Sequence, residues 1–319
     1  NQGGSWVQLG ADIDGEAAFN YSGVAVSLSS NGSVVAIGAS TNSGSGSYRG
    51  HVRVYGYQSG SWVQLGADID GEADNDYSGN AVSLSSDGTI LAIGARYNEY
   101  SINQGQVRVY EYQGGNWIQL GADIDGKTAG DQLGYSVSLS SDGSVLASGA
   151  PANENNGENS GNVQVFENQG GNWVQLGTDI NGEAASDQSG WSVSLSSDGS
   201  IVAIGAITNS GNGYQSGQVR VFENQGGSWV QLGADIDGEA ASEFAGRSLS
   251  LSSNGTIVAV GVVGSAGNGG LTGAVRVYEY QGGSWVKLGA DIDGEAAGDQ
   301  SGFSVSLSSN GSIVATGAC

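Results

Sequence analysis

Acidic side chains gather in one recurring segment, which in its full form reads Asp-Ile-Asp-Gly-Glu. Most of the 32 acidic residues lie in six copies of this segment and the residues that follow it. Carboxylates around a tight Gly turn supply the hard oxygen ligands that Ca²⁺ prefers. The sequence therefore offers as candidate metal ligands Asp12, Asp14, Glu16, Asp68, Asp70, Glu72, Asp235, Asp237, Glu239, Asp291, Asp293 and Glu295.

A structural interpretation of these acids competes with the metal site. The first Asp of each copy could cap its loop by accepting backbone N–H groups, as Asx turns do, and leave the other carboxylates solvated. The spacing differs from that of an EF-hand. The copies also differ from one another, because Lys127 replaces the Glu of the third and Asn181 the second Asp of the fourth. We expect no required cofactor, with Ca²⁺ as the candidate ion.

Residues for nucleophilic or acid–base catalysis are scarce. The one His, His51, stands where other copies have Gln, Asn or Ala, and is predicted to be an exposed substitution. The one Cys, Cys319, has no evident base partner, and a hydrolytic triad needs a base beside its nucleophile. The acids recur in every copy, whereas an enzyme would normally break the repeat at one place. We expect no catalytic residue and no enzyme activity.

Arginine and aromatic residues also recur. Arg53, Arg108, Arg220 and Arg276 share one position, where an ion pair or hydrogen bond to a loop carboxylate is predicted and a ring of ligand-binding Arg is the alternative. Six Trp recur and are predicted to pack in the core, although Trp can also stack on a sugar. The aromatic residues outside this regularity are better candidates for a specific contact: Phe19, Tyr135, Trp191 and Phe303.

The spacing of the recurring Trp defines the domain organisation. They stand at positions 6, 62, 117, 173, 229 and 285, which are 55 or 56 residues apart. A fixed period of this length indicates a repeat architecture. We expect a single domain over 1–319, with units of about 6–61, 62–116, 117–172, 173–228, 229–284 and 285–319, the last one partial.

Each unit carries four short strand signals separated by turns. Segments such as SVSLSS and VLASGA flank Asn-Gly or Asp-Gly, which is the strongest short hairpin signal and favours a type I′ turn. VRVYEY and WVQLG are joined by Gln-Gly-Gly or a variant. Antiparallel units of this kind predict an all-β fold, a six-bladed β-propeller with the Ser-rich strand lining the axis. An open β-solenoid is the alternative.

A count of these signals leaves one strand missing. The WVQLG, SVSLSS and VLASGA types occur six times and the VRVYEY type five times. The last blade would therefore lack one strand, and an open sheet edge is a liability. We expect that the chain is a section of a longer repeat protein or filament, or that another chain, such as a second copy, supplies the strand.

Part of the repeat resembles a known family. The segment Gly134-Tyr135-Ser136-Val137-Ser138-Leu139, then Asp142-Gly143, Ala147-Ser148-Gly149-Ala150-Pro151 and Gly161-Asn162-Val163-Gln164-Val165-Phe166, resembles FG-GAP repeats. These build integrin-α-type propellers and occur in tandem-repeat surface proteins of marine bacteria and algae. The resemblance implies an adhesion or interaction module. The family's calcium loop between the first two strands is not carried over, because that turn is a bare Asp-Gly or Asn-Gly here.

Composition limits the partners and the location. With 9 basic and 32 acidic residues the net charge is -23, which argues against binding nucleic acid or anionic membranes. The sequence has no apolar run long enough for a membrane helix. We expect an extracellular or cell-surface, non-catalytic adhesion or structural module that contacts protein or polysaccharide. The alternatives are a calcium-dependent or carbohydrate-binding lectin and a propeller hydrolase. N-x-S/T motifs make Asn20, Asn31, Asn254 and Asn310 candidate glycan acceptors.

Overall fold

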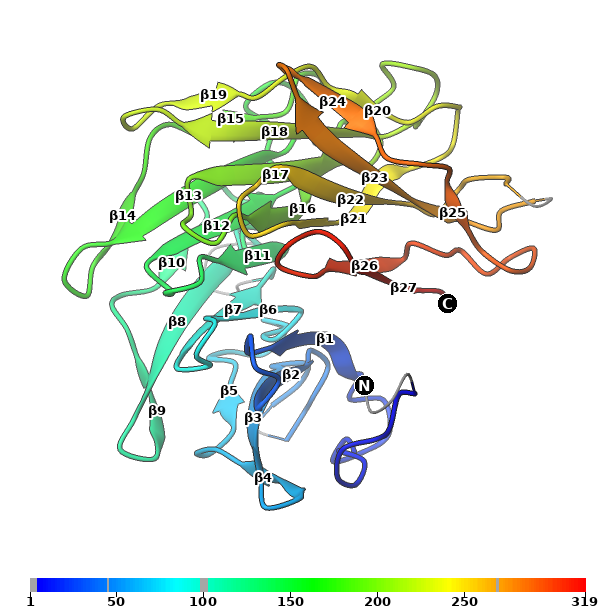
Figure 1. Ribbon diagram of the computed structural model, residues 1–319. Coiled ribbons are helices and arrows are strands. Elements are labelled where there is room, and N and C mark those ends of the chain that lie inside the picture. Colours follow the sequence, from blue (N-terminus) through cyan, green and yellow to red (C-terminus); the bar gives the residue numbers. More distant parts are fainter. Residues whose placement is uncertain (1–4, 45, 98–102, 268–269) are drawn as a thin grey trace.

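The chain folds into sheets that follow one another around a central axis (Figure 1). The structure, a computed structural model, describes residues 5–44, 46–97, 103–267 and 270–319. Within these ranges all regular elements are β-strands, arranged in six antiparallel sheets. No helix among the described residues is long and apolar enough to cross a membrane. The predicted all-β, six-bladed propeller is confirmed.

Five blades hold four strands in the order inner to outer and a short fifth strand. The first blade consists of β1 (Ser22–Leu28), β2 (Val34–Ala39), β3 (His51–Gln58), β4 (Ser61–Gln64) and β5 (Ile69–Asp70). The second consists of β6 (Ala81–Leu84), β7 (Ile90–Ala95), β8 (Gln106–Gln113), β9 (Asn116–Gln119) and β10 (Ile124–Asp125). The third consists of β11 (Ser136–Leu139), β12 (Val145–Ala150), β13 (Asn162–Asn168), β14 (Trp173–Gln175) and β15 (Ile180–Asn181).

The remaining blades repeat this order. The fourth consists of β16 (Ser189–Leu195), β17 (Ile201–Ala206), β18 (Gln218–Asn224), β19 (Trp229–Gln231) and β20 (Ile236–Asp237). The fifth consists of β21 (Ala245–Leu251), β22 (Ile257–Val262), β23 (Ala274–Gln281), β24 (Ser284–Lys287) and β25 (Ile292–Asp293). The sixth has only β26 (Ser304–Leu307) and β27 (Val314–Gly317) within the described residues.

The short fifth strand is a feature that the sequence did not predict. In the first blade, β5 continues the edge of β3 beyond β4, with Val52 paired to Ile69 and His51 to Asp70. Ile69 is buried, so this two-residue strand holds the start of the acidic loop against the first blade. A two-residue strand has no alternation to detect in a sequence, which is why its signal is absent.

The hairpins at Asp-Gly form as predicted, but their turn type differs. Gly88 N donates to Ser85 O, and a positive φ is found at Gly88 but not at Asp87. A type I′ turn needs positive φ at both central residues, so that prediction is wrong. The carboxylate of Asp87 instead accepts hydrogen bonds from Ser85 Oγ and Thr89 N at 2.6 and 3.0 Å, which fixes the turn.

The Ser-rich strand is the inner strand of each blade, as predicted, and its Ser hydroxyls also join neighbouring blades. The hydroxyl of Ser194 accepts a hydrogen bond from Leu251 N, at 3.0 Å, in the next blade. The same bond recurs at Ser27, Ser83, Ser138 and Ser250. Close approach also explains Gly94, where an added Cβ would collide with Gly134 O of the next blade.

The apolar core lies between the blades. Between the third and fourth blades, for example, Val163 and Val165 are buried together with Val202 and Phe222, and Trp229 packs against this cluster. Trp229 Nε1 also donates to Leu176 O of the previous blade at 2.8 Å. Equivalent bonds are made by Trp62, Trp117, Trp173 and Trp285. Core packing is confirmed for Trp117, Trp173, Trp229 and Trp285, which pack against buried clusters between blades.

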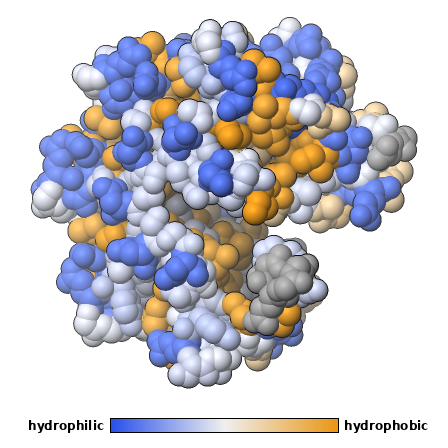
Figure 2. Space-filling view, in the orientation of Figure 1, coloured by the Kyte–Doolittle hydropathy of each residue, from blue (hydrophilic) through white to orange (hydrophobic). Residues whose placement is uncertain are grey.

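The ring is open between the first and sixth blades (Figures 1 and 2). A cavity of about 600 Å³ lies there, lined by residues of β1, β26 and β27. Trp6 is 87% exposed, and its segment does not pair with the sixth blade. Within the described residues the sixth blade is a sheet of two strands, β26 and β27.

Candidate functional site

The acidic loops lie at one edge of the ring. Each loop runs from the outer strand of one blade to the inner strand of the next, so equivalent loops share that edge. The last acid of the loop, rather than the first, accepts the backbone N–H groups: Asp187 accepts from Glu183 and Ala184. The first Asp accepts from a Gln side chain four residues earlier, as Asp68 does from Gln64 at 2.6 Å. The predicted capping by the first Asp is therefore wrong.

The recurring Arg residues pair with these loops, as predicted. Arg108 Nη2 donates to Asp70 O at 2.8 Å, and its Nη1 lies 3.8 Å from Glu72 Oε1. Arg108 is 5% exposed. Arg53 and Arg220 make the same two contacts with their own loops. Their charges are taken up by the scaffold, so the alternative of a ligand-binding Arg ring is not supported.

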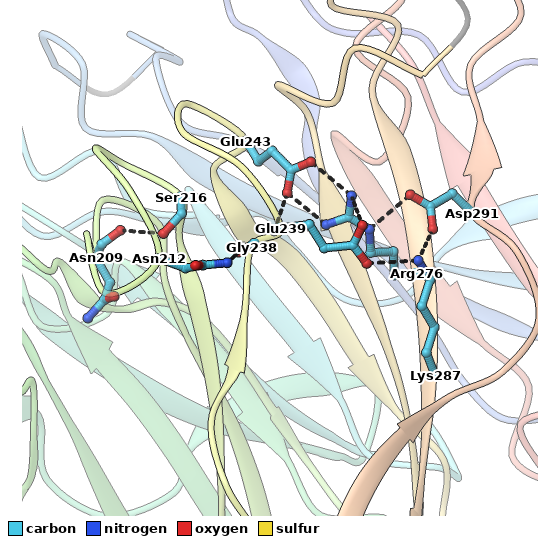
Figure 3. Close-up of polar contacts among 9 residues, drawn as sticks. All are labelled: Asn209, Asn212, Ser216, Gly238, Glu239, Glu243, Arg276, Lys287 and Asp291. Carbon is cyan, nitrogen blue, oxygen red and sulfur yellow. Dashed lines mark hydrogen bonds and ion pairs between the residues drawn. The ribbon is translucent and has the colours of Figure 1, made fainter.

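The fifth blade carries the densest of these networks (Figure 3). Arg276 donates to both carboxylate oxygens of Glu243, at 2.7 and 2.8 Å, and to Asp291 at 2.9 Å. Lys287 contacts Asp291 and Glu239. Burial alone would raise the pKa of Glu243, but the hydrogen bonds and charge of Arg276 outweigh burial and hold that pKa below its usual range. Burial would lower the pKa of Arg276, and its two acidic partners raise it.

His51 is buried rather than exposed, so the prediction of an exposed substitution is wrong. It begins β3, and only 2% of its surface is accessible. Pairing of β3 with both β2 and β5 encloses that position, which a strand pattern alone does not reveal. Burial lowers the pKa of His51, while the charges of Asp68 and Glu16 act in the opposite direction.

One group of three metal-ligating side chains is found among the described residues: Glu16, His51 and Asp68. Their ligand atoms lie within 4.8 Å of one another. The group joins two successive acidic loops, whereas the sequence suggested ligands within one loop. The other predicted ligands are not gathered in this way: Asp12, Asp14, Asp70, Glu72, Asp235, Asp237, Glu239, Asp291, Asp293 and Glu295. Calcium binding at those positions stays a prediction.

A second cluster breaks the repeat at the same edge, around the axis. Tyr135, Trp191, Arg247 and Phe303 occupy one repeat position at the start of successive inner strands. The ring centres of Tyr135 and Trp191 are 4.6 Å apart. Arg247 Cζ lies 5.2 Å from the Trp191 ring centre and 4.2 Å from that of Phe303. Phe19, also predicted as a contact residue, is 87% exposed and lies outside this cluster.

Arg96 extends the cluster on its other side. Its Cζ lies 5.6 Å from the Tyr135 ring centre, 5.0 Å from that of Tyr97 and 5.8 Å from that of Tyr77. We call these seven residues the axial cluster: Tyr77, Arg96, Tyr97, Tyr135, Trp191, Arg247 and Phe303. The two Arg and Tyr77 and Tyr97 are not among the residues predicted from the sequence. The available signal was a charge, Arg247, at a position that aromatic residues hold in neighbouring blades.

Arg247 differs from the scaffold arginines in its electrostatics. Among the described residues it has no carboxylate partner, and burial lowers its pKa. Burial raises the pKa of Tyr135 to about 12, although the charges of Arg247 and Arg96 act against it. Tyr135 and Arg247 belong to blades two apart, and the Trp191 ring of the blade between them contacts both. Tyr135 and Cys319 act on the pKa of Arg247 in the direction opposite to burial. A half-buried cation without a carboxylate partner favours an anionic ligand or a developing negative charge.

A polar cavity of about 300 Å³ is lined by residues of the loops around the fourth blade, and none of the seven residues of the axial cluster lines it. Gln188 lines it, and its backbone oxygen accepts a hydrogen bond from Trp191 N. The other lining residues are Asn159, Ser186, Thr208, Ser210, Tyr214 and Gln215. This volume suits a small ligand, and the lining offers hydroxyl and amide groups that hydrogen-bond to sugar hydroxyls.

Comparison with known families decides the nature of the repeat. The model of the FG-GAP repeat matches residues 124–166 and 181–222. The chain carries FG-GAP repeats. Each match runs from the short strand of one blade to the third strand of the next, so the matched repeat includes the acidic loop. No curated protein matches the sequence.

Solved structures similar to the FG-GAP propeller share its fold at low sequence identity. A periplasmic gluconolactonase of Pseudomonas aeruginosa superposes with a TM-score of 0.60 at 18% identity, covering 92% of this chain and 77% of its own. A candidate 6-phosphogluconolactonase from Bacteroides uniformis gives 0.52 at 12%, covering 85% of each chain. A candidate TolB from Agrobacterium tumefaciens gives 0.51 at 13%, covering 92% and 89%.

These comparisons correct two predictions. A non-catalytic adhesion or structural module, and the absence of enzyme activity, are contradicted, because the first two of these structures are of a lactonase and a candidate lactonase. The sequence argument rested on an unbroken repeat. The repeat is in fact broken at the axis, where Arg247 and its aromatic neighbours replace the small or apolar residue of the first blade, Val24.

Proposed function

We propose that this chain is a propeller hydrolase that opens a sugar lactone at the axial cluster and releases the sugar acid. The observation that carries the proposal is the guanidinium of Arg247, held between two aromatic rings without a carboxylate partner among the described residues. Aromatic faces suit the apolar face of a sugar ring.

The reaction needs stabilisation of negative charge. Water adds to the lactone carbonyl carbon, the ring C–O bond breaks, and the leaving oxygen takes a proton to become a hydroxyl group. Negative charge develops on the carbonyl oxygen, and Arg247 stabilises it electrostatically. The product is a carboxylate, which the same guanidinium binds. Tyr135, whose pKa lies at about 12, keeps its phenol proton at neutral pH and can donate a hydrogen bond.

The similar structures give independent support for the substrate class. The first is named a gluconolactonase and the second a candidate 6-phosphogluconolactonase, and both names denote lactones of sugar acids. The first protein is also described as periplasmic, which supports a location outside the cytoplasm for this chain.

Hydrolysis of glucono-δ-lactone, followed by acid release in a pH-stat, tests the proposal. We expect turnover by the wild type and a loss of about 10²–10³ in kcat/KM for Arg247→Asn. Asn is the residue of the second blade at this position, Asn80, so the backbone accommodates it. Arg220→Gln is the matched control, because Gln164 holds that position in the third blade. Equal activity of Arg247→Asn and wild type, or no turnover by the wild type, would contradict the proposal.

A carbohydrate-binding module without hydrolysis is the second candidate. It is favoured by the composition of the axial cluster, in which aromatic rings and arginines are present but no carboxylate or His contacts Arg247 among the described residues. Calorimetry with gluconate separates the two candidates. Binding of gluconate that depends on Arg247, without turnover of the lactone, would select this candidate.

A further inference from the structure

The contact between successive acidic loops recurs in the five complete blades. It brings the Glu position of one loop close to the first Asp of the next, beside the first residue of the third strand. The paired positions are Glu16 and Asp68, Glu72 and Asp123, Lys127 and Asp179, Glu183 and Asp235, and Glu239 and Asp291. In four of these pairs both positions are acidic. Such like charges at close range need a cation or a hydrogen-bond donor between them.

Two blades place a protein cation at this contact. In the third blade, Lys127 Nζ lies 2.6 Å from Asp179 Oδ1. In the fifth blade, Lys287 bridges Glu239 and Asp291, and Arg276 adds a second cation (Figure 3). In both blades a positively charged side chain therefore pairs with the first Asp of the next loop.

Two further blades use an amide. Gln106 Nε2 donates to Glu72 Oε2 and Asp125 Oδ1, both at 3.4 Å. Gln218 Nε2 donates to Glu183 Oε2 at 3.1 Å and to Asp237 Oδ1 at 3.4 Å. A Gln at the start of the third strand thus gives the Glu of one loop a hydrogen-bond donor and links it to the second Asp of the next loop.

The first blade has neither device. His51 takes the Gln position, and its Nδ1 lies 3.8 Å from Glu16 Oε2 and 3.7 Å from Asp68 Oδ2. Both distances are too long for hydrogen bonds. No hydrogen bond of the His51 ring is found among the described residues, although its side chain is only 3% exposed. Arg53 approaches Glu16 only at 3.9 Å, and on the other carboxylate oxygen.

These distances fit three ligands of one ion. Zn²⁺ binds imidazole nitrogen at about 2.0–2.1 Å and carboxylate oxygen at about 2.0–2.2 Å, so two tetrahedral ligand atoms stand about 3.4 Å apart. The two distances from His51 Nδ1, 3.7 and 3.8 Å, need to shorten by a few tenths of an ångström to reach that value, and the carboxylate oxygens of Glu16 and Asp68 lie within 4.8 Å of each other. Gln64 holds Asp68 Oδ1 at 2.6 Å and Asn42 donates to Glu16 Oε2 at 3.2 Å, which orients both carboxylates. Such outer partners tune a metal site.

We propose that Glu16, His51 and Asp68 form a binding site for one divalent transition-metal ion of the Zn²⁺ class. Nitrogen with two carboxylates favours such an ion over Ca²⁺, which prefers oxygen ligands only. Three protein ligands leave a fourth position open to water on the solvent side, where Glu16 and Asp68 are 46% and 31% exposed. The site does not depend on the axial cluster, so the two proposals can fail separately.

Calorimetric titration of the full chain with Zn²⁺ tests the site. All variants carry Cys319→Ser, because the exposed thiol is itself a Zn²⁺ ligand. The wild-type site should bind one ion and raise the melting temperature. His51→Gln copies the residue of the second and fourth blades, so it should fold normally and bind Zn²⁺ far more weakly, beyond the roughly 10–100-fold that loss of an outer partner costs. Glu16→Gln should behave alike if His51→Gln fails to fold.

A gain of binding gives the converse test. Gln106→His places an imidazole between Glu72 and Asp123 and should add a second Zn²⁺ ion per chain. The proposal would be overturned if the Cys319→Ser protein bound no Zn²⁺. It would also be overturned if adding His51→Gln or Glu16→Gln left the affinity for Zn²⁺ unchanged. Titration with Ca²⁺ is the control for general attraction of cations to the acidic edge. The affinity for Ca²⁺ should be the same with His51 and in His51→Gln.

Discussion

The guanidinium carbon of Arg247 lies 4.2 Å from the centre of the Phe303 ring. The two residues hold the same repeat position in neighbouring blades, 56 residues apart in the sequence. Packing of β21 against β26 is what brings them together. A cation so placed interacts with the ring face and stays without a carboxylate partner among the described residues.

The charge of Arg247 should determine which sugars the axial cluster prefers. Wild-type protein should bind gluconate more tightly than glucose, and added salt should reduce that preference because it screens the charge. Arg247→Asn should remove the preference while leaving the melting temperature nearly unchanged. Calorimetry with both ligands at two salt concentrations measures the effect. If Arg247→Asn still preferred gluconate to glucose, the carboxylate of gluconate would bind at a site other than Arg247.

Serine hydroxyls between the blades should contribute to stability where the partner blade is present. Ser194→Ala leaves Leu251 N without its acceptor and should cost about 1–3 kcal/mol in the free energy of unfolding. Ser306 holds the same repeat position in β26, is exposed and makes no such bond among the described residues. Ser306→Ala should therefore be neutral. Urea unfolding of both variants measures the difference, and equal losses would contradict the open ring.

The outer tryptophans offer a matched pair. Trp229→Phe removes the hydrogen bond to Leu176 O but keeps most of the apolar contact, so the expected loss is about 1 kcal/mol. Trp6→Phe should change nothing, since Trp6 is 87% exposed. Chemical denaturation followed by circular dichroism measures both. A larger loss at Trp6 than at Trp229 would show that the Trp6 segment is packed in solution.

The Glu243–Arg276 pair should make the protein sensitive to acid. The pKa of Glu243 is depressed in the folded state, so the unfolded chain binds its proton first as the pH falls. The stabilisation is fully present above the unfolded pKa of about 4.3 and is lost as the pH falls through the lower folded value. Glu243→Ala should cost about 1–3 kcal/mol at pH 7, because it removes two charge-assisted hydrogen bonds of Arg276 while Asp291 and Glu239 still compensate the buried charge.

The pH dependence of unfolding distinguishes this pair from general charge effects. In Glu243→Ala, the free energy of unfolding should fall less between pH 5 and pH 3 than in the wild type. Glu158→Gln, which changes an exposed acid in another loop, should leave the profile as it is. A wild-type slope retained by Glu243→Ala would rule out Glu243 as its source.

Much of the fold follows from local signals. A Trp every 55 or 56 residues and paired apolar segments around Asp-Gly predicted six blades, because hairpin chemistry acts within a few residues. The Arg108 type of ion pair was also predictable, since a buried cation needs an acid and the loops supply one. The turn type and the short β5-type strand were not, because both depend on how the backbone meets the neighbouring strand.

The sequence by itself determined the repeat, the all-β blades and the acidic edge, since each arises from residues close together in the chain. Only the tertiary structure decided that His51 is enclosed between Glu16 and Asp68, and that Tyr135, Trp191, Arg247 and Phe303 meet at the axis. The physical reason is the same in both cases. These side chains come from different blades, so their distances are set by the packing of sheet against sheet rather than by spacing along the chain.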